Sequence, residues 1–244
     1  MPKIYSASAG TPDDGFVSKV GQSSWANARD ATSGTASLNN TRYSSAISAQ
    51  YFAGRGGGND FRVTRSFFVF DTSGITGTVA SAKIGLKGYV STSGSAIAVK
   101  STAFGGDGGT ALASGDFYAI SGWSAGSSLA GSATVYGPQI TSWNGSAYNE
   151  FTGSSDLLAD IKNNNVVIVC VMNYTQDYLN SAPVSSFAVG THFAEFGGSG
   201  VTSDPYIDYT LATGYGNAVN GIAAANISKV NGIATADISK VNGI

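Results

Sequence analysis

Charge is scarce in this chain of 244 residues, and its scarcity excludes one class of partner. Only 11% of the residues are charged, against about 25% in an ordinary soluble domain. The formal net charge is −2, and the 13 lysines and arginines are scattered along the sequence. A nucleic-acid-binding protein would show a basic stripe or patch, so we expect no nucleic-acid partner.

Cysteine and long apolar runs are also nearly missing. Cys170 has no second cysteine with which to pair, so the fold is not a small scaffold held by disulfides. It lies in the apolar run Val166–Met172, where we expect a buried side chain rather than a reactive thiol. No apolar run approaches the roughly 18 residues that a membrane span requires, and Met1–Ser6 lacks the apolar core of an export signal. We expect no membrane insertion.

One histidine and two glutamates leave few side chains for catalysis. His192 has no accompanying nucleophile motif, and we interpret it as a structural or surface residue. Asp13 and Asp14 stand in Pro-Asp-Asp-Gly, which we interpret as a solvated turn. Asp107 and Asp116 lie in glycine-rich loops without the regular oxygen spacing of a Ca²⁺ loop. We therefore predict no enzyme, cofactor or metal. Because glycosidase carboxylates are defined by their separation in space, a polysaccharide-degrading enzyme stays a third alternative.

What the sequence does contain is a series of short strand-like segments. The run Arg65–Asp71 is apolar on both sides, which predicts a central strand covered on both faces. Ala80–Tyr89 alternates apolar residues with glycine or lysine, which predicts a neighbouring strand of the same sheet with one face in water. Asn-Gly at Asn144 predicts a hairpin turn. Other strand-like runs are Phe16–Val20, Ile47–Phe52, Ile97–Ser101, Thr134–Tyr136, Tyr148–Phe151, Val166–Met172, Phe187–Val189, His192–Phe196 and Tyr206–Leu211.

One short helix is predicted among these strands. Ser154 or Ser155 is a suitable capping residue, and Leu157, Leu158 and Ile161 fall on one face. Many short strands with a single small helix are typical of an antiparallel β-sandwich or jelly roll. The fold class that we predict is therefore all-β, an antiparallel β-sandwich or jelly roll with one short helix and an extended β-type repeat tail.

The predicted organisation has three parts. Residues 1–60 form a leading segment of short strands and loops, which we assign to the sandwich. Residues 61–213 form the sandwich core, and residues 214–244 form the tail. The tail differs in kind from the rest because it repeats one short sequence.

The repeat in the tail is Val-Asn-Gly-Ile, which begins at Val219, Val230 and Val241 with a period of 11 residues. Asn-Gly favours a turn between strands, which predicts a β meander, whereas an 11-residue period also suits a right-handed helical supercoil. Asn-Gly inside a helix would cost about 1 kcal/mol or more per repeat, so we favour the β form. Neither form buries its aliphatic side chains alone. We predict oligomerisation or docking through Val219, Ile222, Ile227, Val230, Ile233, Ile238, Val241 and Ile244.

Aromatic and amide side chains near the predicted loops form a second candidate site. A sugar-binding sandwich needs flat aromatic faces for pyranose rings and amides for hydroxyl groups. The alternative is that the rings fill the ends of the sandwich or pack at subunit contacts. The candidate glycan-binding residues are Trp123, Trp143, Tyr148, Asn144 and Tyr174.

Several features of residues 61–211 match one family of sandwich domains. They are an Arg-Ser-aromatic-x-x-Phe-Asp strand at Arg65–Asp71, a Ser-Ala-x-Ile-x-Leu strand at Ser81–Leu86, a late Leu/Ile helix and a Pro-Tyr-Ile-x-Tyr strand at Pro205–Tyr209. In these features the chain resembles the DNRLRE-type β-sandwich, a jelly-roll domain like a carbohydrate-binding module. Ser142-Trp143-Asn144 is only an approximate counterpart of the Trp-rich segment ending in Thr-Trp that is usual in that family.

The tail is similar to the Lys-Val-Asn-Gly-Ile repeats found at the ends of phage virion proteins and some bacterial surface proteins. This resemblance implies a non-enzymatic virion structural protein on the particle exterior, either a capsid decoration or a fibre or appendage subunit. Its partners would be copies of itself, for example in a trimer, and other virion proteins. The alternative is a glycan-binding module of a fibre or surface adhesin, with cell-surface glycans as partners and an extracellular location.

Overall fold

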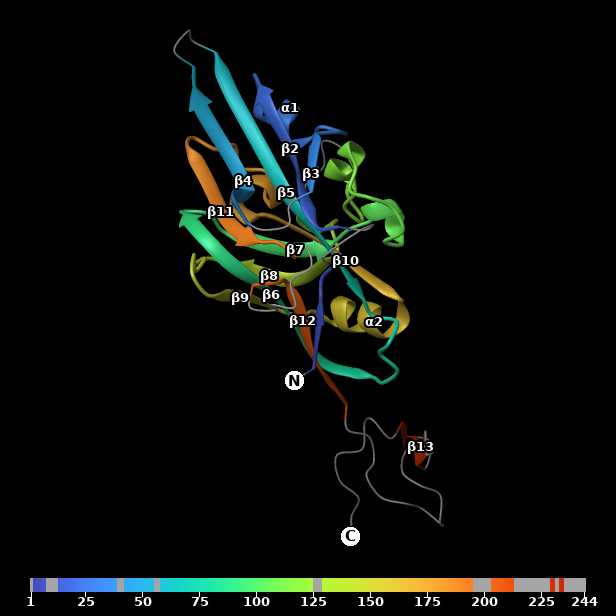
Figure 1. Cartoon of the computed structure of the whole chain (residues 1–244). Helices are drawn as coiled ribbons and strands as arrows, with labels where there is room; N and C mark the ends of the chain where they lie inside the picture. The colour runs from blue at the N-terminus through green and yellow to red at the C-terminus, as the bar shows by residue number, and fades with distance from the viewer. Residues whose placement is uncertain are drawn as a thin grey trace.

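The computed structural model describes residues 2–7, 13–38, 42–54, 58–124, 129–194, 203–212, 229–230 and 233–234. Their main feature is one curled antiparallel sheet of 12 strands (Figure 1). Along the curl the order is β1-β12-β6-β11-β4-β5-β10-β7-β8, with β2 beside β5, β3 beside β2 and β9 beside β6. The predicted all-β, sandwich-like fold is confirmed.

The strands are β1 (Lys3–Tyr5), β2 (Gly15–Gln22), β3 (Thr35–Leu38), β4 (Arg42–Ala53), β5 (Asn59–Asp71), β6 (Val79–Thr92), β7 (Ala96–Lys100), β8 (Val135–Ile140), β9 (Tyr148–Thr152), β10 (Val166–Asn173), β11 (Ser186–His192), β12 (Tyr206–Leu211), β13 (Lys229–Val230) and β14 (Ile233–Ala234). The helices are α1 (Trp25–Arg29), α2 (Ser155–Asn163), two 3₁₀ segments, η1 (Phe104–Gly106) and η2 (Ser114–Tyr118), and one π-helical turn, η3 (Tyr174–Tyr178).

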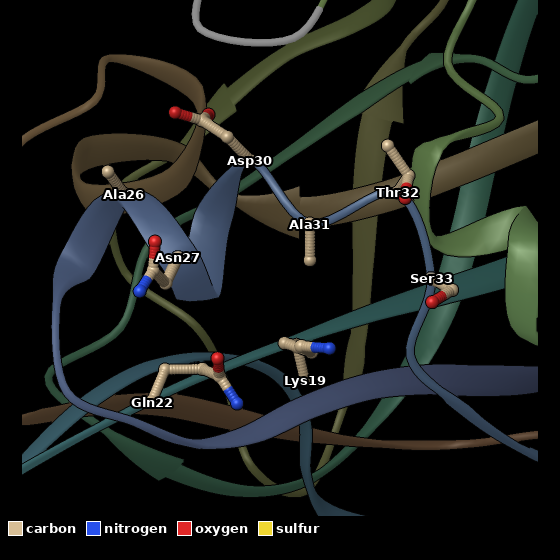
Figure 2. Close-up of a pocket in the computed structure, with 8 residues that line it drawn as sticks. All are labelled: Lys19, Gln22, Ala26, Asn27, Asp30, Ala31, Thr32 and Ser33. Carbon is tan, nitrogen blue, oxygen red and sulfur yellow. The ribbon is translucent and has the colours of Figure 1, made fainter.

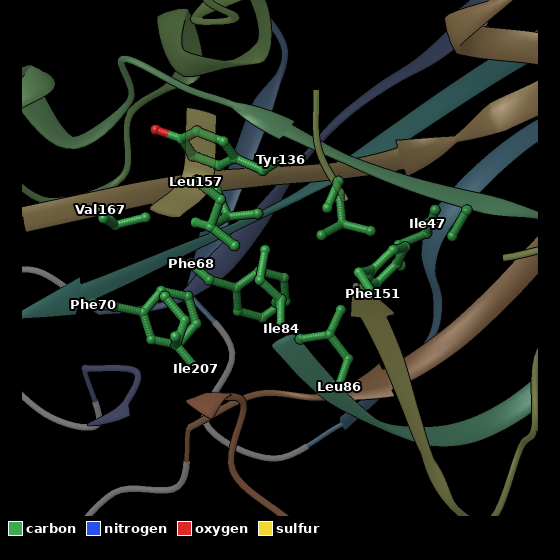
Figure 3. Close-up of a cluster of buried hydrophobic side chains, with 14 of the residues drawn as sticks. Ile47, Phe68, Phe70, Ile84, Leu86, Tyr136, Phe151, Leu157, Val167 and Ile207 are labelled. Carbon is green, nitrogen blue, oxygen red and sulfur yellow. The ribbon is translucent and has the colours of Figure 1, made fainter. Parts of the chain in front are cut away.

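Strand β5 lies at the centre of the body and is covered on both faces, as the sequence predicts. Its residues from Val63 to Phe70 are all buried. Phe68 and Phe70 belong to the main core, which fills the space between the two halves of the curled sheet (Figure 3). Phe67 and Val69 point to the opposite side and belong to a second core. Alternation along the strand therefore feeds two separate hydrophobic cores.

Strand β6 is not a neighbour of β5, so that prediction is wrong. β5 pairs with β2, β4 and β10, whereas β6 pairs with β9, β11 and β12. The connection after β5 crosses to the other half of the sheet, where Ile84 of β6 meets Phe68 across the main core (Figure 3). The face of β6 with Lys83 and Lys87 is turned away from this core, as its alternation predicts.

The segment around Asn144 is also not the predicted hairpin turn. β8, before it, pairs with β7, and β9, after it, pairs with β6, so the segment joins the two halves of the curled sheet. Asn144 closes the turn with its own side chain, because Oδ1 accepts hydrogen bonds from the main-chain nitrogens of Ser146 (2.9 Å) and Ala147 (3.0 Å). The run predicted at Phe187–Val189 lies in β11, which has an irregularity between Val189 and Thr191 and ends at His192. Of the run predicted at His192–Phe196, only His192 belongs to this strand; Phe193 and Ala194 follow it without strand structure, and the last two residues lie outside the described part of the chain.

The sequence predicts that β5 is covered on both faces, but it does not predict which segments form the second core on its outer side. This core lies under α1, η1, η2 and the loops between β7 and β8, which cover the outer side of β5, β7 and β10. It makes that half of the sheet a buried layer rather than a surface. Its largest buried members are Phe67, Phe104, Phe117, Trp123, Met172 and Tyr178.

Helix α2 is the predicted helix, and it begins and ends where the sequence signals place it. The Ser154 hydroxyl accepts a hydrogen bond from the Leu157 main-chain nitrogen (3.3 Å). Leu157 and Ile161 are fully buried in the main core, and Asn164 follows the last turn. The helix packs against β6, β8 and β10 at one end of the sandwich.

Replacing Ser154 with alanine should lower the free energy of unfolding by about 1 kcal/mol, because the first turn of α2 loses its capping acceptor. Ser155 is exposed and makes no capping bond, so Ser155→Ala should change stability by less than about 0.5 kcal/mol. Chemical denaturation of both variants measures the difference. Equal effects would show that the Ser154 cap does not hold the helix.

In the tail, the described residues form one small antiparallel pair. Lys229 lies opposite Ala234, and Val230 lies opposite Ile233. The two residues between the strands, Asn231 and Gly232, lie outside the described residues, as do Val219, Ile222, Ile227, Ile238, Val241 and Ile244. No helix in the described part of the chain is long and apolar enough to cross a membrane.

Candidate interaction sites

The five predicted glycan-binding residues form two groups in different parts of the body. Trp143, Asn144 and Tyr148 lie at and just before the start of β9. Trp123 belongs to the second core, and Tyr174 packs against that core from η3. The residues therefore do not form one continuous surface.

Both tryptophans are interior side chains. Trp143 is 6% exposed, and its indole nitrogen donates a hydrogen bond to the Gly190 carbonyl (3.0 Å). Trp123 is also 6% exposed, and the guanidinium carbons of Arg65 and Arg29 lie 4.7 and 5.4 Å from its ring centroid. Neither indole presents a flat face at the described surface. Their positions agree with the alternative interpretation, in which these rings fill the sandwich.

Asn144 and Tyr148 lie at the rim of a surface that we call the lysine–tyrosine face. It is the outer side of β1, β12, β6 and β9, and the register of these strands places its side chains in adjacent rows. One row runs through Tyr5, Tyr206, Gly85 and Glu150. The lysine–tyrosine face consists of Lys3, Tyr5, Lys83, Lys87, Tyr148, Glu150 and Tyr206.

Ammonium groups lie against the tyrosine rings of this face. The Lys3 Nζ atom is 3.5 Å from the ring centroid of Tyr206 and 5.7 Å from that of Tyr148. Lys87 Nζ lies 5.6 Å from the Tyr148 centroid. Tyr5, which is 37% exposed, meets Tyr206 edge to face with the centroids 6.5 Å apart. Lys3 therefore covers the ring of Tyr206, which is only 3% exposed, and both lysines lie near the half-buried ring of Tyr148.

Glu150 connects the lysines and tyrosines. Its carboxylate accepts hydrogen bonds from Lys83 Nζ (2.7 Å) and from the Tyr206 hydroxyl (2.8 Å). These two bonds hold the pKa of Glu150 below its usual value, so the carboxylate is ionised at neutral pH. Burial raises the pKa of Tyr148 to about 12, and burial together with Glu150 raises the pKa of Tyr206, so both phenols stay protonated. The face thus presents phenols, ammonium groups and a carboxylate side by side.

Gly85 makes this arrangement possible. A Cβ atom at Gly85 would lie 2.3 Å from Cζ of Tyr206, so the ring lies flat over a position that has no side chain. Only glycine permits this approach, which brings the Tyr206 hydroxyl to Glu150.

Gly85→Ala should displace the Tyr206 ring and lower the free energy of unfolding by about 1–3 kcal/mol, the range for overpacking a filled site. A Cβ atom at Gly74 would meet nothing within 4 Å, so Gly74→Ala is the control and should change stability far less. Thermal unfolding and tyrosine fluorescence follow the two effects. Unchanged stability of Gly85→Ala would contradict the close contact.

Two hollows offer further polar surfaces. One is an open groove of about 630 Å³ between α1 and β2, lined by Lys19, Gln22, Ala26, Asn27, Asp30, Ala31, Thr32 and Ser33 (Figure 2). Asp30 is engaged by the Arg29 guanidinium (2.5 Å), and no aromatic ring is among these lining residues. The groove therefore lacks a stacking platform for a sugar.

The second hollow is a cleft of about 560 Å³ beside α2, with Lys100, Asp107, Tyr136 and Asn163–Asn165 among its lining residues. Asp160 orders one wall, because it accepts hydrogen bonds from Lys100 Nζ (2.7 Å) and the Tyr136 hydroxyl (2.5 Å). Burial alone would raise the pKa of Asp160, but these two donors hold it below its usual value. The Tyr136 ring itself is buried, so this cleft offers amides and charges without an exposed ring.

The remaining candidates from the sequence have local roles. Asp107 and Asp116 accept hydrogen bonds from the main-chain nitrogens of Gly109 (2.8 Å) and Ala113 (2.9 Å) in their own loops. His192 ends β11 with its ring edge-on to a tyrosine, at a centroid distance of 6.0 Å. Cys170 is buried as predicted, and burial raises the pKa of its thiol. Among the described ranges, no three or more His, Cys, Asp or Glu side chains gather as a metal site.

The sequence analysis did not predict two clusters of buried ionisable residues. Asp13 and Asp14 are 1% and 0% exposed, so their interpretation as a solvated turn is wrong, and Asp14 Oδ1 accepts a hydrogen bond from the Val69 main-chain nitrogen of β5 (3.2 Å). Arg65 and Asp177, both fully buried, form a salt bridge in the second core. A signal for Arg65 was present, because an arginine inside a run that is otherwise apolar requires a buried partner. Asp177 carries no such signal.

Comparison with known proteins adds no relative. No protein-family model matches the chain, and no curated protein matches it either. The class of the chain therefore follows from its structure alone, an all-β protein built on a curled, sandwich-like antiparallel sheet.

Proposed function

We propose that the chain is a non-enzymatic structural protein of a phage virion, either a capsid decoration or a subunit of a fibre or appendage. Its tail mediates oligomerisation or docking, and its body is displayed on the particle exterior. The observation that carries the proposal is the repeat of Val-Asn-Gly-Ile every 11 residues, with an apolar side chain left exposed where the repeat is described.

The described part of the repeat supports a docking role because it leaves an apolar side chain exposed. Strands β13 and β14 have two residues each and flank a two-residue Asn-Gly connection, the loop length of a tight hairpin. Ile233 is 55% exposed on this pair. A two-stranded hairpin is only marginally stable in water, so it gains stability when a partner covers its apolar side.

Repetition supports assembly rather than a single contact. Three copies of one sequence give several equivalent contacts within one chain, and linked contacts raise the overall avidity without any new type of interaction. The body complements this role, because two hydrophobic cores and few charges make a rigid and weakly charged unit. The virion location rests on the resemblance of the tail to phage virion proteins.

A full-length variant with Ile222→Ser, Ile233→Ser and Ile244→Ser tests the proposal. These are the isoleucines that follow each Asn-Gly, and the change removes apolar area without shortening the chain. We expect light scattering to show that the variant no longer self-associates, and we expect that it no longer co-sediments with virion particles. The control is Lys229→Ser with Lys240→Ser, which changes polar residues of the same tail and should retain both properties. Retention of both by the isoleucine variant would refute the docking role.

A second candidate function is glycan binding, favoured by the lysine–tyrosine face. Phenol rings, ammonium groups and a carboxylate lie together there, with the exposed Asn144 at the rim. The full chain should then bind in a glycan array, and Tyr5→Ala should abolish the binding, since Tyr5 is the most exposed ring of the face. Phe52→Ala is the control, because Phe52 is 41% exposed on β4, outside the face. A chain that binds no glycan would remove this candidate.

A further inference from the structure

Three half-buried aromatic rings lie side by side at the end of the body where β4 stops and β5 starts. They are Trp25 at the start of α1, Tyr51 of β4 and Phe61 of β5. The Phe61 centroid lies 5.1 Å from that of Tyr51 and 6.3 Å from that of Trp25. Trp25 and Phe61 also pack against the second core, whereas Tyr51 belongs to neither core of the described chain. Core packing therefore does not account for the whole cluster, which we call the aromatic strip.

Each outer ring of the aromatic strip holds an asparagine at the surface. The Trp25 indole nitrogen donates a hydrogen bond to Asn180 Oδ1 (2.9 Å), and the Tyr51 hydroxyl donates one to Asn59 Oδ1 (3.0 Å). Both asparagines are exposed, and their Nδ2 atoms make no hydrogen bond to another described residue. Because the bonds to the rings occupy the Oδ1 atoms, the N–H groups of each amide stay available to a ligand. The strip thus presents two oriented amide donors beside three rings.

The aromatic strip adjoins the groove between α1 and β2. Gln22 of β2 lies opposite Phe61 of β5 in the strand register, and it also lines the groove of about 630 Å³. Figure 2 shows further amide and hydroxyl side chains along this groove, those of Asn27 and Ser33 among them. The charged residues of the lining are one lysine and one aspartate, so their charges balance. Rings and groove together form an elongated, polar and uncharged site of a volume that suits a ligand.

These groups match the chemistry of a neutral oligosaccharide. Sugar units place apolar C–H groups against aromatic faces and offer their hydroxyl groups to amides. An acidic glycan would call for cations without a counter-charge. Because ring and amide are already held together, less conformational entropy is lost when the ligand binds. The planes of Tyr51 and Phe61 are tilted by 42° and those of Trp25 and Phe61 by 56°, which fits successive sugar units that are rotated against one another better than a flat surface.

We propose that the aromatic strip and the adjoining groove bind a neutral oligosaccharide of several sugar units. The site is separate from the lysine–tyrosine face and shares only the class of ligand with the second candidate function. Figure 1 shows α1, the end of β4 and the start of β5 at one end of the body, and the end of β12, which leads to the tail, at the other. A tail docked as proposed above therefore leaves this site open to a ligand.

A glycan array of neutral and acidic oligosaccharides, probed with the full-length chain, is the first test. We expect binding to neutral oligosaccharides, and calorimetry with the neutral oligosaccharide of strongest signal then gives the affinity. Tyr51→Ala should weaken this affinity about 10-fold or more, because it removes one ring and releases Asn59. Phe52→Ala is the matched control and should leave the affinity unchanged. Phe52 is the next residue of β4, 41% exposed, with its side chain on the opposite face of the strand.

Tryptophan fluorescence is a second measurement, and it does not require a variant that loses binding. Trp123 and Trp143 are each 6% exposed, so Trp25 is the indole that acrylamide and a ligand can reach. We expect the same neutral oligosaccharide to protect the unaltered chain from quenching by acrylamide. Trp25→Phe should remove this protection without changing the circular dichroism of the chain.

Three results would overturn the proposal. The first is an unaltered chain that binds no neutral oligosaccharide, or only acidic ones. The second is a bound neutral oligosaccharide that leaves the quenching of the unaltered chain unchanged. The third is binding that Tyr5→Ala abolishes and Tyr51→Ala leaves intact, which would place the sugar on the lysine–tyrosine face. This third result removes the site proposed here but retains the second candidate function, so the two can fail separately.

Discussion

Replacing Asp177 with alanine should lower the free energy of unfolding by about 3–5 kcal/mol, the cost of breaking a buried ion pair by removing one partner. Asp177 receives two hydrogen bonds from Arg65, at 2.7 Å from Nε and 2.6 Å from Nη2. All three side chains of the cluster, Arg29, Arg65 and Asp177, are fully buried. In the variant, Arg65 keeps only main-chain acceptors, the carbonyls of Phe117 and Arg29. Its charge is then left in the second core without a counter-ion.

An exposed pair on the same strand supplies the control. Arg62 and Asp60 of β5 form an ion pair whose side chains are 42% and 28% exposed. Asp60→Ala should cost at most about 1 kcal/mol, because water screens an exposed pair. Urea denaturation of both variants compares the two losses. A loss for Asp177→Ala no larger than that for Asp60→Ala would show that the buried cluster is not a structural support of the body.

Phe67→Ala should destabilise the body as much as Phe68→Ala, by about 3–5 kcal/mol each. The two residues are neighbours on β5 with side chains on opposite faces, and both are fully buried. Phe68 stacks on Phe193 in the main core, with the centroids 5.5 Å apart, whereas Phe67 packs in the second core. An ordinary two-layer sandwich would have one of these faces in water, so equal losses are specific to a strand between two cores.

The control for this pair is Phe52→Ala on β4, where the side chain is 41% exposed and should be worth far less. Calorimetric unfolding of the three variants gives the comparison. If Phe67→Ala behaved like Phe52→Ala, the layer formed by α1, η1 and η2 would not cover β5 in solution.

The sequence predicted elements well where the local pattern determined them. Alternation in β6 and β12, the double-sided apolar run of β5, and the serine cap and apolar face of α2 are all signals carried by neighbouring residues. β6, β12 and α2 appear in the structure with bounds close to the predicted ones, whereas β5 begins well before the predicted Arg65, at Asn59. Such signals need no knowledge of what lies across the core.

Strand pairing was harder to predict from the sequence, because the residues of a turn do not show whether the chain returns to the same half of the sheet. The Ser73-Gly74 turn leads from β5 to a strand in the other half, and the Asn144 turn does the same between β8 and β9. The second core was hidden for a related reason, since its covering loops are rich in glycine and serine and show no periodicity.

The candidate sites could be predicted from the sequence only in part. An aromatic residue near a predicted loop gives no information on its burial, and Trp123 and Trp143 proved to be interior. The lysine–tyrosine face is assembled from four strands that are distant in sequence, and it depends on the missing side chain at Gly85. The repeat, in contrast, is visible in the sequence itself, which is why the proposed docking role rests on the tail.

Native mass spectrometry of the full-length chain, combined with a symmetry determination, tests that role most directly. We expect one closed oligomer, for example a trimer, which dissociates into folded monomers when residues 214–244 are removed. Retained circular dichroism of the shortened chain would show that the body is intact. A full-length chain that stays monomeric at every concentration, or an oligomer that persists without residues 214–244, would contradict the assignment of assembly to the repeats.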